Sequence, residues 1–279
     1  MAIFEGAGVA LITPMKADGS VNYDKLEEII EMQIDGGTDA IISCGTTGEA
    51  STLSEEEHIS CVRFTCEKVR GRIPVIAGTG SNSTATAKEL TADATDAGAD
   101  ALLVVTPYYN KSTQNGLKKH FSEVASVTKL PMLLYNIPGR TGVKIEAETM
   151  VGLWRDVSNI VGVKDATGDL AETAKVLSLS DGGVDVYSGN DDIVVPLMSL
   201  GGKGVISVLS NILPTPTHDM VKAALDGDYK TAASIQLKYF SLIKALFSEV
   251  NPIPVKEAMN IMGLDVGGLR LPLTKMEDG

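Results

Sequence analysis

The segment Asp35-Gly36-Gly37-Thr38-Asp39-Ala40-Ile41-Ile42 has a close counterpart 61 residues later, Asp96-Ala97-Gly98-Ala99-Asp100-Ala101-Leu102-Leu103. In each copy a glycine able to end a helix stands shortly before an apolar run of the kind found in buried strands. The two copies therefore predict the same helix-to-strand junction twice, two structural units apart. This spacing indicates a fold made of repeated strand and helix units.

Apolar runs of similar length recur along the chain at intervals of about 30 residues, the length of one βαβ unit. These runs cover residues 9–12, 40–43, 74–77, 101–105, 132–135, 160–163, 184–187 and 204–207. Their continuous apolar character is typical of parallel strands that are buried on both faces. The intervening segments 23–34 and 54–69 carry apolar residues at helical spacing, which predicts crossover helices.

Eight consecutive units favour closure into a (β/α)8 TIM barrel over an open, doubly wound sheet. No GxGxxG motif follows the first run, so the dinucleotide-binding alternative has no support. We expect residues 1–210 to form a catalytic barrel and residues 211–279 to form a C-terminal helical extension. Helices expected at 229–247 and 255–262 would pack against the barrel or against another subunit.

The amino-acid composition argues against nucleic acid and membranes as binding partners. The chain has 279 residues with 36 acidic and 24 basic side chains, a formal net charge of −12 that repels nucleic acid and anionic membranes. No apolar run approaches a membrane span, and the N-terminus shows no secretory signal. Three cysteines are typical of a reducing compartment, which predicts the cytoplasm. The three histidines lack metal-ligand spacing, so we expect no metal and no cofactor.

Active sites of such barrels lie at the C-terminal ends of the strands. Lys164 ends the run 160–163 and should point into the barrel mouth, whereas Lys203 precedes its strand and belongs at the opposite end. Tyr135 ends the preceding strand and leads into a loop with Arg140, whose guanidinium can hold a carboxylate. Taken singly, the lysine is equally compatible with a strand-end lysine reaching solvent, and a core tyrosine and a surface arginine are the more common interpretation of the other two.

A lysine among apolar walls has a lowered pKa, and its free amine can condense with a ketone to form an iminium. Such chemistry needs proton donors nearby. The segment Gly45-Thr46-Thr47-Gly48-Glu49 follows another strand and offers hydroxyl and backbone N–H groups that can hold a small anion. By itself this segment is only a polar turn.

Five motifs together resemble one enzyme family. They are Gly45-Thr46-Thr47-Gly48-Glu49, Thr106-Pro107-Tyr108-Tyr109-Asn110, Tyr135-Asn136-Ile137-Pro138-Gly139-Arg140-Thr141-Gly142, Gly162-Val163-Lys164-Asp165-Ala166-Thr167-Gly168 and Gly201-Gly202-Lys203-Gly204-Val205-Ile206-Ser207. Their order and spacing are similar to those of the dihydrodipicolinate synthase (4-hydroxy-tetrahydrodipicolinate synthase) family, from end to end. The lysine motif indicates only the wider superfamily of pyruvate-dependent class I aldolases. The Arg140 motif discriminates, because sialic acid lyases and sugar-acid aldolases usually lack that arginine.

The resemblance implies a reaction between pyruvate and aspartate semialdehyde in lysine and diaminopimelate biosynthesis. Lys164 would form a Schiff base with pyruvate, and Arg140 would bind the carboxylate of the semialdehyde. Thr47 would hold the pyruvate carboxylate, in a cradle completed by Gly45 and Ile206.

The resemblance also implies a proton relay of Thr46, Tyr135 and Tyr109. In the family, the residue matching Tyr109 reaches across a tight dimer interface into the neighbouring active site. We therefore expect a homo-oligomer, a tetramer built from tight dimers, although dimers also occur in the family. The family commonly continues through a further helix beyond Thr274, whereas this chain ends at Gly279, a departure expected to affect chemistry little.

A lysine-inhibition cleft in the same interface is implied at Ala50, Glu55, His58, Asn82, Thr86 and Tyr108. Lysine-sensitive relatives commonly carry histidine at the position of Glu55 and glutamate at that of Thr86, so the usual carboxylate is displaced here. We expect free lysine to bind weakly for this reason.

Two other functions fit parts of the pattern. Another pyruvate-dependent aldolase, such as a sialic acid or sugar-acid lyase, would also use Lys164 but would ignore aspartate semialdehyde. A non-catalytic keto-acid sensor would bind without a covalent adduct. The presence of Lys164, Tyr135, Tyr109, Thr46 and Arg140 in one chain argues against a sensor, because a sensor needs no proton relay.

Overall fold

The computed structural model describes residues 2–277, in which eight parallel strands form a closed barrel in sequential order. The strands are β1 (Gly6–Ala10), β2 (Ala40–Ser43), β3 (Val75–Gly78), β4 (Ala101–Val105), β5 (Met132–Asn136), β6 (Ile160–Asp165), β7 (Asp185–Ser188) and β8 (Gly204–Ser207). Pairing of β1 with β8, with Gly8 opposite Ile206, closes the barrel. The prediction of a (β/α)8 barrel is confirmed.

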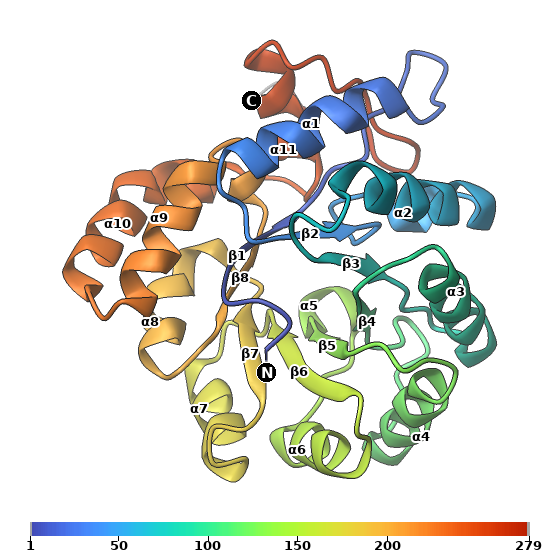
Figure 1. The fold of residues 1–279 in the computed structure, drawn as a ribbon, viewed down its shortest axis with the longest axis vertical. Coiled ribbons are helices and arrows are strands. Elements are labelled where there is room, and N and C mark those ends of the chain that lie inside the picture. Colours follow the sequence, from blue (N-terminus) through green and yellow to red (C-terminus); the bar gives the residue numbers. More distant parts are fainter. Residues whose placement is uncertain (1, 278–279) are drawn as a thin grey trace.

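Helices surround the barrel as a ring (Figure 1). They are α1 (Tyr23–Asp35), α2 (Glu55–Val69), α3 (Thr84–Asp96), α4 (Gln114–Ala125), α5 (Pro138–Thr141), α6 (Ala147–Asp156), α7 (Leu170–Leu179), α8 (Val194–Ser199), α9 (Pro214–Leu225), α10 (Tyr229–Ala245) and α11 (Ile253–Ile261). Three short 3-10 turns, η1 (Ala50–Thr52), η2 (Asp191–Ile193) and η3 (Leu209–Asn211), lie in loops that follow strands.

The repeated segment behaves as its sequence predicts. Gly37 and Gly98 have backbone φ angles of +83° and +92°, values that disfavour residues with a side chain, and each stands between a helix and the next strand. On α1 the apolar face formed by Leu26, Ile29 and Ile30 is buried. Local sequence thus determines where these helices end and which side they turn to the barrel.

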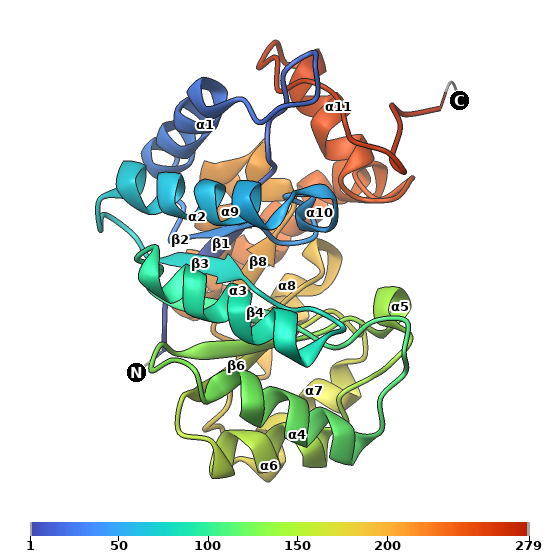
Figure 2. The same cartoon turned by 90° about the vertical axis from the view of Figure 1, so that its right-hand side faces the viewer.

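Helix α9 follows β8 and packs against β1, so it occupies the eighth helix position of the barrel. The expected boundary at residue 210 lies before this helix, and the division into residues 1–210 and 211–279 stays a prediction. Helix α10 packs on α9 and α8. Figure 2 shows α11 and the C-terminal segment at the same end of the molecule as α1. Across residues 2–277, no helix combines the length and apolarity needed to cross a membrane.

Candidate functional site

Lys164 is buried near the C-terminal end of β6, in register with Tyr135 of β5 and Tyr187 of β7. Its Nζ lies 4.4 Å from the centroid of the Tyr135 ring. Within residues 2–277 the amine makes no ion pair and no hydrogen bond that meets ordinary geometric criteria. The lysine therefore loses hydration without gaining a direct counter-ion.

Burial lowers the pKa of Lys164 to about 8, with the Asp191 carboxylate acting in the opposite direction and the Arg140 charge adding to the decrease. At neutral pH such a lysine holds roughly 300 times more free amine than a fully solvated lysine. The free amine is the nucleophilic form, so the site can support attack on a carbonyl carbon.

The negative charge of Asp191 acts on Lys164 and favours its protonated form. No role for this residue was predicted from the sequence. It is buried in η2, directly after β7, and its Oδ2 accepts the backbone N–H groups of Val208 and Leu209, both at 3.0 Å. Its Oδ1 is buried with no partner among the described residues. The strand-end rule, applied to β7 as it was to β6, would have pointed to this carboxylate.

Tyr135 places its side chain beside the lysine. Burial raises the pKa of Tyr135 to about 12, although the Arg140 charge and the neighbouring Thr46 hydroxyl act in the opposite direction. The phenol is therefore protonated at neutral pH and can donate a proton. A neutral donor next to an iminium avoids placing a second charge in a buried site.

The loop after β2 contacts several other segments of the chain through Gly48 and Glu49. Thr13 Oγ1 donates to the Gly48 carbonyl at 2.6 Å, and a Cβ added to Gly48 would come within 3.0 Å of the Leu11 carbonyl oxygen. Glu49, at a φ of +55°, forms a fully buried ion pair with Lys256 of α11 at 2.7 Å. The close approach of the Leu11 backbone thus explains why residue 48 is a glycine. The buried ion pair between Glu49 and Lys256 was not predicted from the sequence.

Thr47 and Arg140 are both tied to Asn251, which lies between α10 and α11. The Asn251 amide Nδ2 donates to Thr47 Oγ1 at 2.9 Å, and Arg140 Nη2 donates to the Asn251 carbonyl oxygen at 2.8 Å. Asn251 and Thr47 are buried, whereas Arg140, in the short helix α5, is exposed to solvent. Residues far apart in the sequence therefore converge on one point.

A cavity of about 460 Å³ extends from Arg140 toward α2 and α3. Its lining includes nine of the predicted site residues: Gly45, Thr46, Ala50, Glu55, His58, Thr86, Tyr108, Tyr135 and Arg140. Thr47, Lys164 and Ile206 are buried and do not line it. One continuous space therefore joins Thr46, Tyr135 and Arg140 to five of the six residues of the predicted inhibition cleft.

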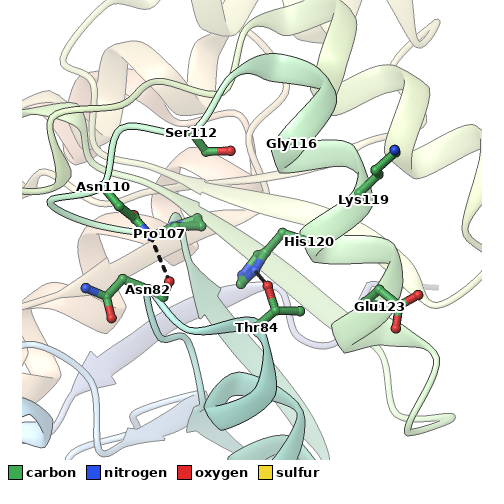
Figure 3. Close-up of a pocket in the computed structure, with 9 residues that line it drawn as sticks. All are labelled: Asn82, Thr84, Pro107, Asn110, Ser112, Gly116, Lys119, His120 and Glu123. Carbon is green, nitrogen blue, oxygen red and sulfur yellow. Dashed lines mark hydrogen bonds between the residues drawn. The ribbon is translucent and has the colours of Figure 1, made fainter.

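Asn82 lies apart from the other five cleft residues. It lines a separate cavity of about 210 Å³ together with Thr84 of α3 and His120 of α4 (Figure 3). There Asn110 Nδ2 donates to the Asn82 carbonyl at 3.0 Å, and Thr84 Oγ1 is hydrogen-bonded to His120 Nδ1 at 2.9 Å. Within this chain the six residues do not line one cavity.

Within this chain, the Tyr109 side chain does not pack against the other predicted relay residues. Its side chain is 90% exposed, so it does not pack against the buried Tyr135. Its backbone has a φ of +75° and its N–H donates to the Thr141 carbonyl at 3.2 Å. Across the described part of the chain, no group of three or more His, Cys, Asp or Glu side chains could hold a metal ion.

The fold and the site define a barrel enzyme with a buried lysine of lowered pKa at a strand end. The sequence pattern of the dihydrodipicolinate synthetase family matches residues 3–279. The chain belongs to this family. Like its relatives in the family, it is a lyase.

The relatives cover the chain from end to end. It is 57% identical to 4-hydroxy-tetrahydrodipicolinate synthase of Lachnoclostridium phytofermentans over 278 residues, which is 100% of this chain and 95% of that protein. The solved structure of dihydrodipicolinate synthase from Aquifex aeolicus has a TM-score of 0.96 at 46% identity, covering 98% of this chain and 93% of the other. A chloride-inhibited dihydrodipicolinate synthase from Acinetobacter baumannii, solved with pyruvate, has a TM-score of 0.96 at 47% identity, covering 99% and 94%.

Proposed function

We propose that this chain condenses pyruvate with aspartate 4-semialdehyde to give 4-hydroxy-tetrahydrodipicolinate, through a Schiff base on Lys164. The observation that carries the proposal is the buried, unpaired amine of Lys164, whose pKa is lowered to about 8 beside the protonated Tyr135. The pyruvate seen in the Acinetobacter baumannii relative supports the choice of first substrate.

In the first step, the Lys164 amine attacks the pyruvate carbonyl carbon and water leaves to give an iminium. The pyruvate carboxylate is held by the Thr47 hydroxyl, with Gly45 and Ile206 completing the cradle. Loss of a proton from the methyl carbon gives an enamine. Thr46 and Tyr135 are suited to carry protons because the Tyr135 ring lies against the amine and the Thr46 hydroxyl neighbours the Tyr135 phenol.

In the second step, the enamine carbon attacks the aldehyde carbon of the semialdehyde and forms a C–C bond, while the new alkoxide takes a proton from the relay. The substrate amine then attacks the iminium carbon, which closes the ring and releases the Lys164 amine. Arg140 is suited to bind the semialdehyde carboxylate because it lines the cavity and is accessible. This local charge is needed because the protein carries a net charge of −12.

We further propose that the chain works in the cytoplasm as a homo-oligomer, a tetramer built from tight dimers. The exposed Tyr109 supports an assembly in which a neighbouring subunit covers this side chain. A sugar-acid lyase is a weaker proposal, because Arg140 suits a carboxylate better than sugar hydroxyls.

Two measurements test the proposal together. Intact mass after incubation with pyruvate and borohydride should rise by one reduced pyruvate on the wild type and not on Lys164→Arg, since a guanidinium cannot form an imine. A coupled assay with aspartate semialdehyde should show turnover. Arg140→Ala should raise KM for the semialdehyde while leaving adduct formation nearly normal. A full adduct on Lys164→Arg, or a wild type that ignores the semialdehyde, would contradict the proposal.

A further inference from the structure

Asn251 connects the two residues proposed to hold the carboxylates of the two substrates. Its side chain donates to Thr47 Oγ1 and its backbone carbonyl accepts from Arg140 Nη2. These partners lie 204 and 111 residues away in the sequence. No other residue in the described part of the chain is hydrogen-bonded to both.

The segment that carries Asn251 is anchored in the barrel. Lys256 of α11, one turn beyond it, is fully buried and donates to Glu49 Oε1 at 2.7 Å and to the Thr13 carbonyl at 3.0 Å. Lys256 also donates to the Gly268 carbonyl, so acceptors from three separate segments fix the position of this lysine. Asn251 therefore presents its amide from a fixed position.

The direction of the Asn251–Thr47 hydrogen bond has a chemical consequence. An amide nitrogen only donates, so the Thr47 oxygen accepts in this bond and its own hydrogen stays free. Among the described residues, Thr47 Oγ1 donates to no other group. A hydroxyl with its hydrogen free is the form that can donate to a carboxylate.

We propose that Asn251 is a positioning residue that fixes the Thr47 hydroxyl as a hydrogen-bond donor toward the pyruvate carboxylate. This inference rests on the proposed function, in which Thr47 binds that carboxylate. Asn251 acts on pyruvate through its side chain, whereas it holds Arg140 through its backbone. A change of the side chain should therefore affect pyruvate and spare the semialdehyde.

A double-mutant cycle tests this coupling. Asn251→Ala and Thr47→Val should each raise KM for pyruvate about tenfold, the worth of one hydrogen bond, while KM for the semialdehyde stays within about twofold. The double variant should be no worse than Thr47→Val alone, because Asn251 acts only through that hydroxyl. Additive effects, or equal increases in both Michaelis constants, would show that Asn251 acts through general structure and overturn the proposal.

Two further variants keep the test decisive. Asn251→Asp has nearly the same size but only accepts hydrogen bonds, so it should capture the Thr47 hydrogen and raise KM for pyruvate more in the wild-type background than beside Thr47→Val. Equal increases in both backgrounds would reveal a charge effect and contradict the proposal. Asn260→Ala is the matched control, because Asn260 holds the Gly267 carbonyl in the same C-terminal segment without touching Thr47, and KM for pyruvate should not change.

The outcome is separable from that of the proposed function. A wild type that forms no pyruvate adduct with borohydride would refute the proposed function itself. Normal wild-type adduct formation with an unchanged KM for pyruvate in Asn251→Ala would refute only the role of Asn251.

Discussion

At the scale of single residues, burial lowers the pKa of Lys164 to about 8, which leaves the amine partly deprotonated near neutral pH. Lys164 is buried with the Tyr135 ring against its amine, and the Asp191 carboxylate, which opposes the decrease in the lysine pKa, accepts two backbone N–H groups at its Oδ2. A direct ion pair with Asp191 would have raised the lysine pKa and suppressed the nucleophile. The arrangement therefore favours reactivity over electrostatic stability.

The pH dependence of adduct formation follows from this pKa. Since the folded-state pKa of Lys164 is about 8, the rate of pyruvate adduct formation should rise about tenfold per pH unit below that value and level off above it. Time courses trapped with cyanoborohydride and read by intact mass measure the rate. A rate that continues to rise to pH 10 would show that the amine is solvated and its pKa is not lowered.

Sequence reasoning could select Lys164 and Tyr135, which the structure places side by side, because strand ends in a barrel can be located from apolar runs alone. It could not find Asn251, because no local pattern indicates that a residue between two late helices returns to the loop after β2. The contacts of Thr47 and Arg140 are long-range, and a single sequence carries no signal for them.

At the scale of elements, the C-terminal segment is fastened to the start of α2. Ser54 and Glu57 form a capping box, and the Arg270 guanidinium donates to both carboxylate oxygens of Glu57 at 2.7 and 2.6 Å. Arg270 also donates to the Thr52 carbonyl at 2.8 Å. The helix start and the loop that carries the threonines are thus connected to a segment more than two hundred residues later in the chain.

This ion pair should give the protein an acid-dependent stability. Hydrogen bonding to Arg270 lowers the pKa of Glu57 to about 2. Because the folded pKa is depressed, the stabilisation is fully present above the ordinary value of 4.5 and is lost as pH falls toward 2. We expect Arg270→Met to reduce the free energy of unfolding by about 1 kcal/mol at pH 6, with the difference from wild type shrinking below pH 4.5.

Urea unfolding of both proteins at several pH values measures this difference. Lys222→Met is the matched control, because Lys222 pairs with Asp226 on the exposed face of α9 and should change stability little. A difference between Arg270→Met and wild type that stays constant down to pH 2 would show that the Arg270 side chain stabilises through its hydrogen bonds to the Gly19 and Thr52 carbonyl oxygens rather than through Glu57.

The cavity between the barrel mouth and α2 bears on inhibition by lysine. A relative from Cyanidioschyzon merolae was solved with lysine bound. In this chain Glu55 is the only acidic side chain among the described residues that line the cavity, and burial lowers the pKa of His58, which disfavours its charged form. We expect little inhibition by lysine at about 1 mM, a concentration range that corresponds to weak binding, and stronger inhibition for Thr86→Glu.

Initial rates against lysine concentration test this expectation, with Thr84→Glu as a control on the same helix but outside this cavity. Strong inhibition of the wild type well below 1 mM would mean that Glu55 has taken over as counter-ion.

At the scale of the whole molecule, the exposed Tyr109 bears on the proposal that a neighbouring subunit completes the site. Tyr109 is 90% exposed and its φ of +75° lies in the left-handed region, which is unfavourable for a residue with a side chain. Backbone strain of this kind is found where a residue is held for function. Nothing in the described part of its own chain covers the ring.

Tyr109→Phe should fold normally and lower turnover by a factor on the order of 10² to 10⁴, the worth of a positioned proton-transfer group. Mixing it with the inactive Lys164→Arg variant under subunit exchange should restore activity, because a mixed dimer would hold one site with both Lys164 and a neighbour's Tyr109. Mass spectrometry of the intact assembly verifies that mixed dimers form. Tyr229→Phe, an exposed tyrosine whose hydroxyl donates to the Met198 carbonyl on the far helices, is the matched control and should keep full turnover. Mixed dimers that recover no activity would show that Tyr109 serves the site of its own chain, and the proposed relay across the interface would be wrong.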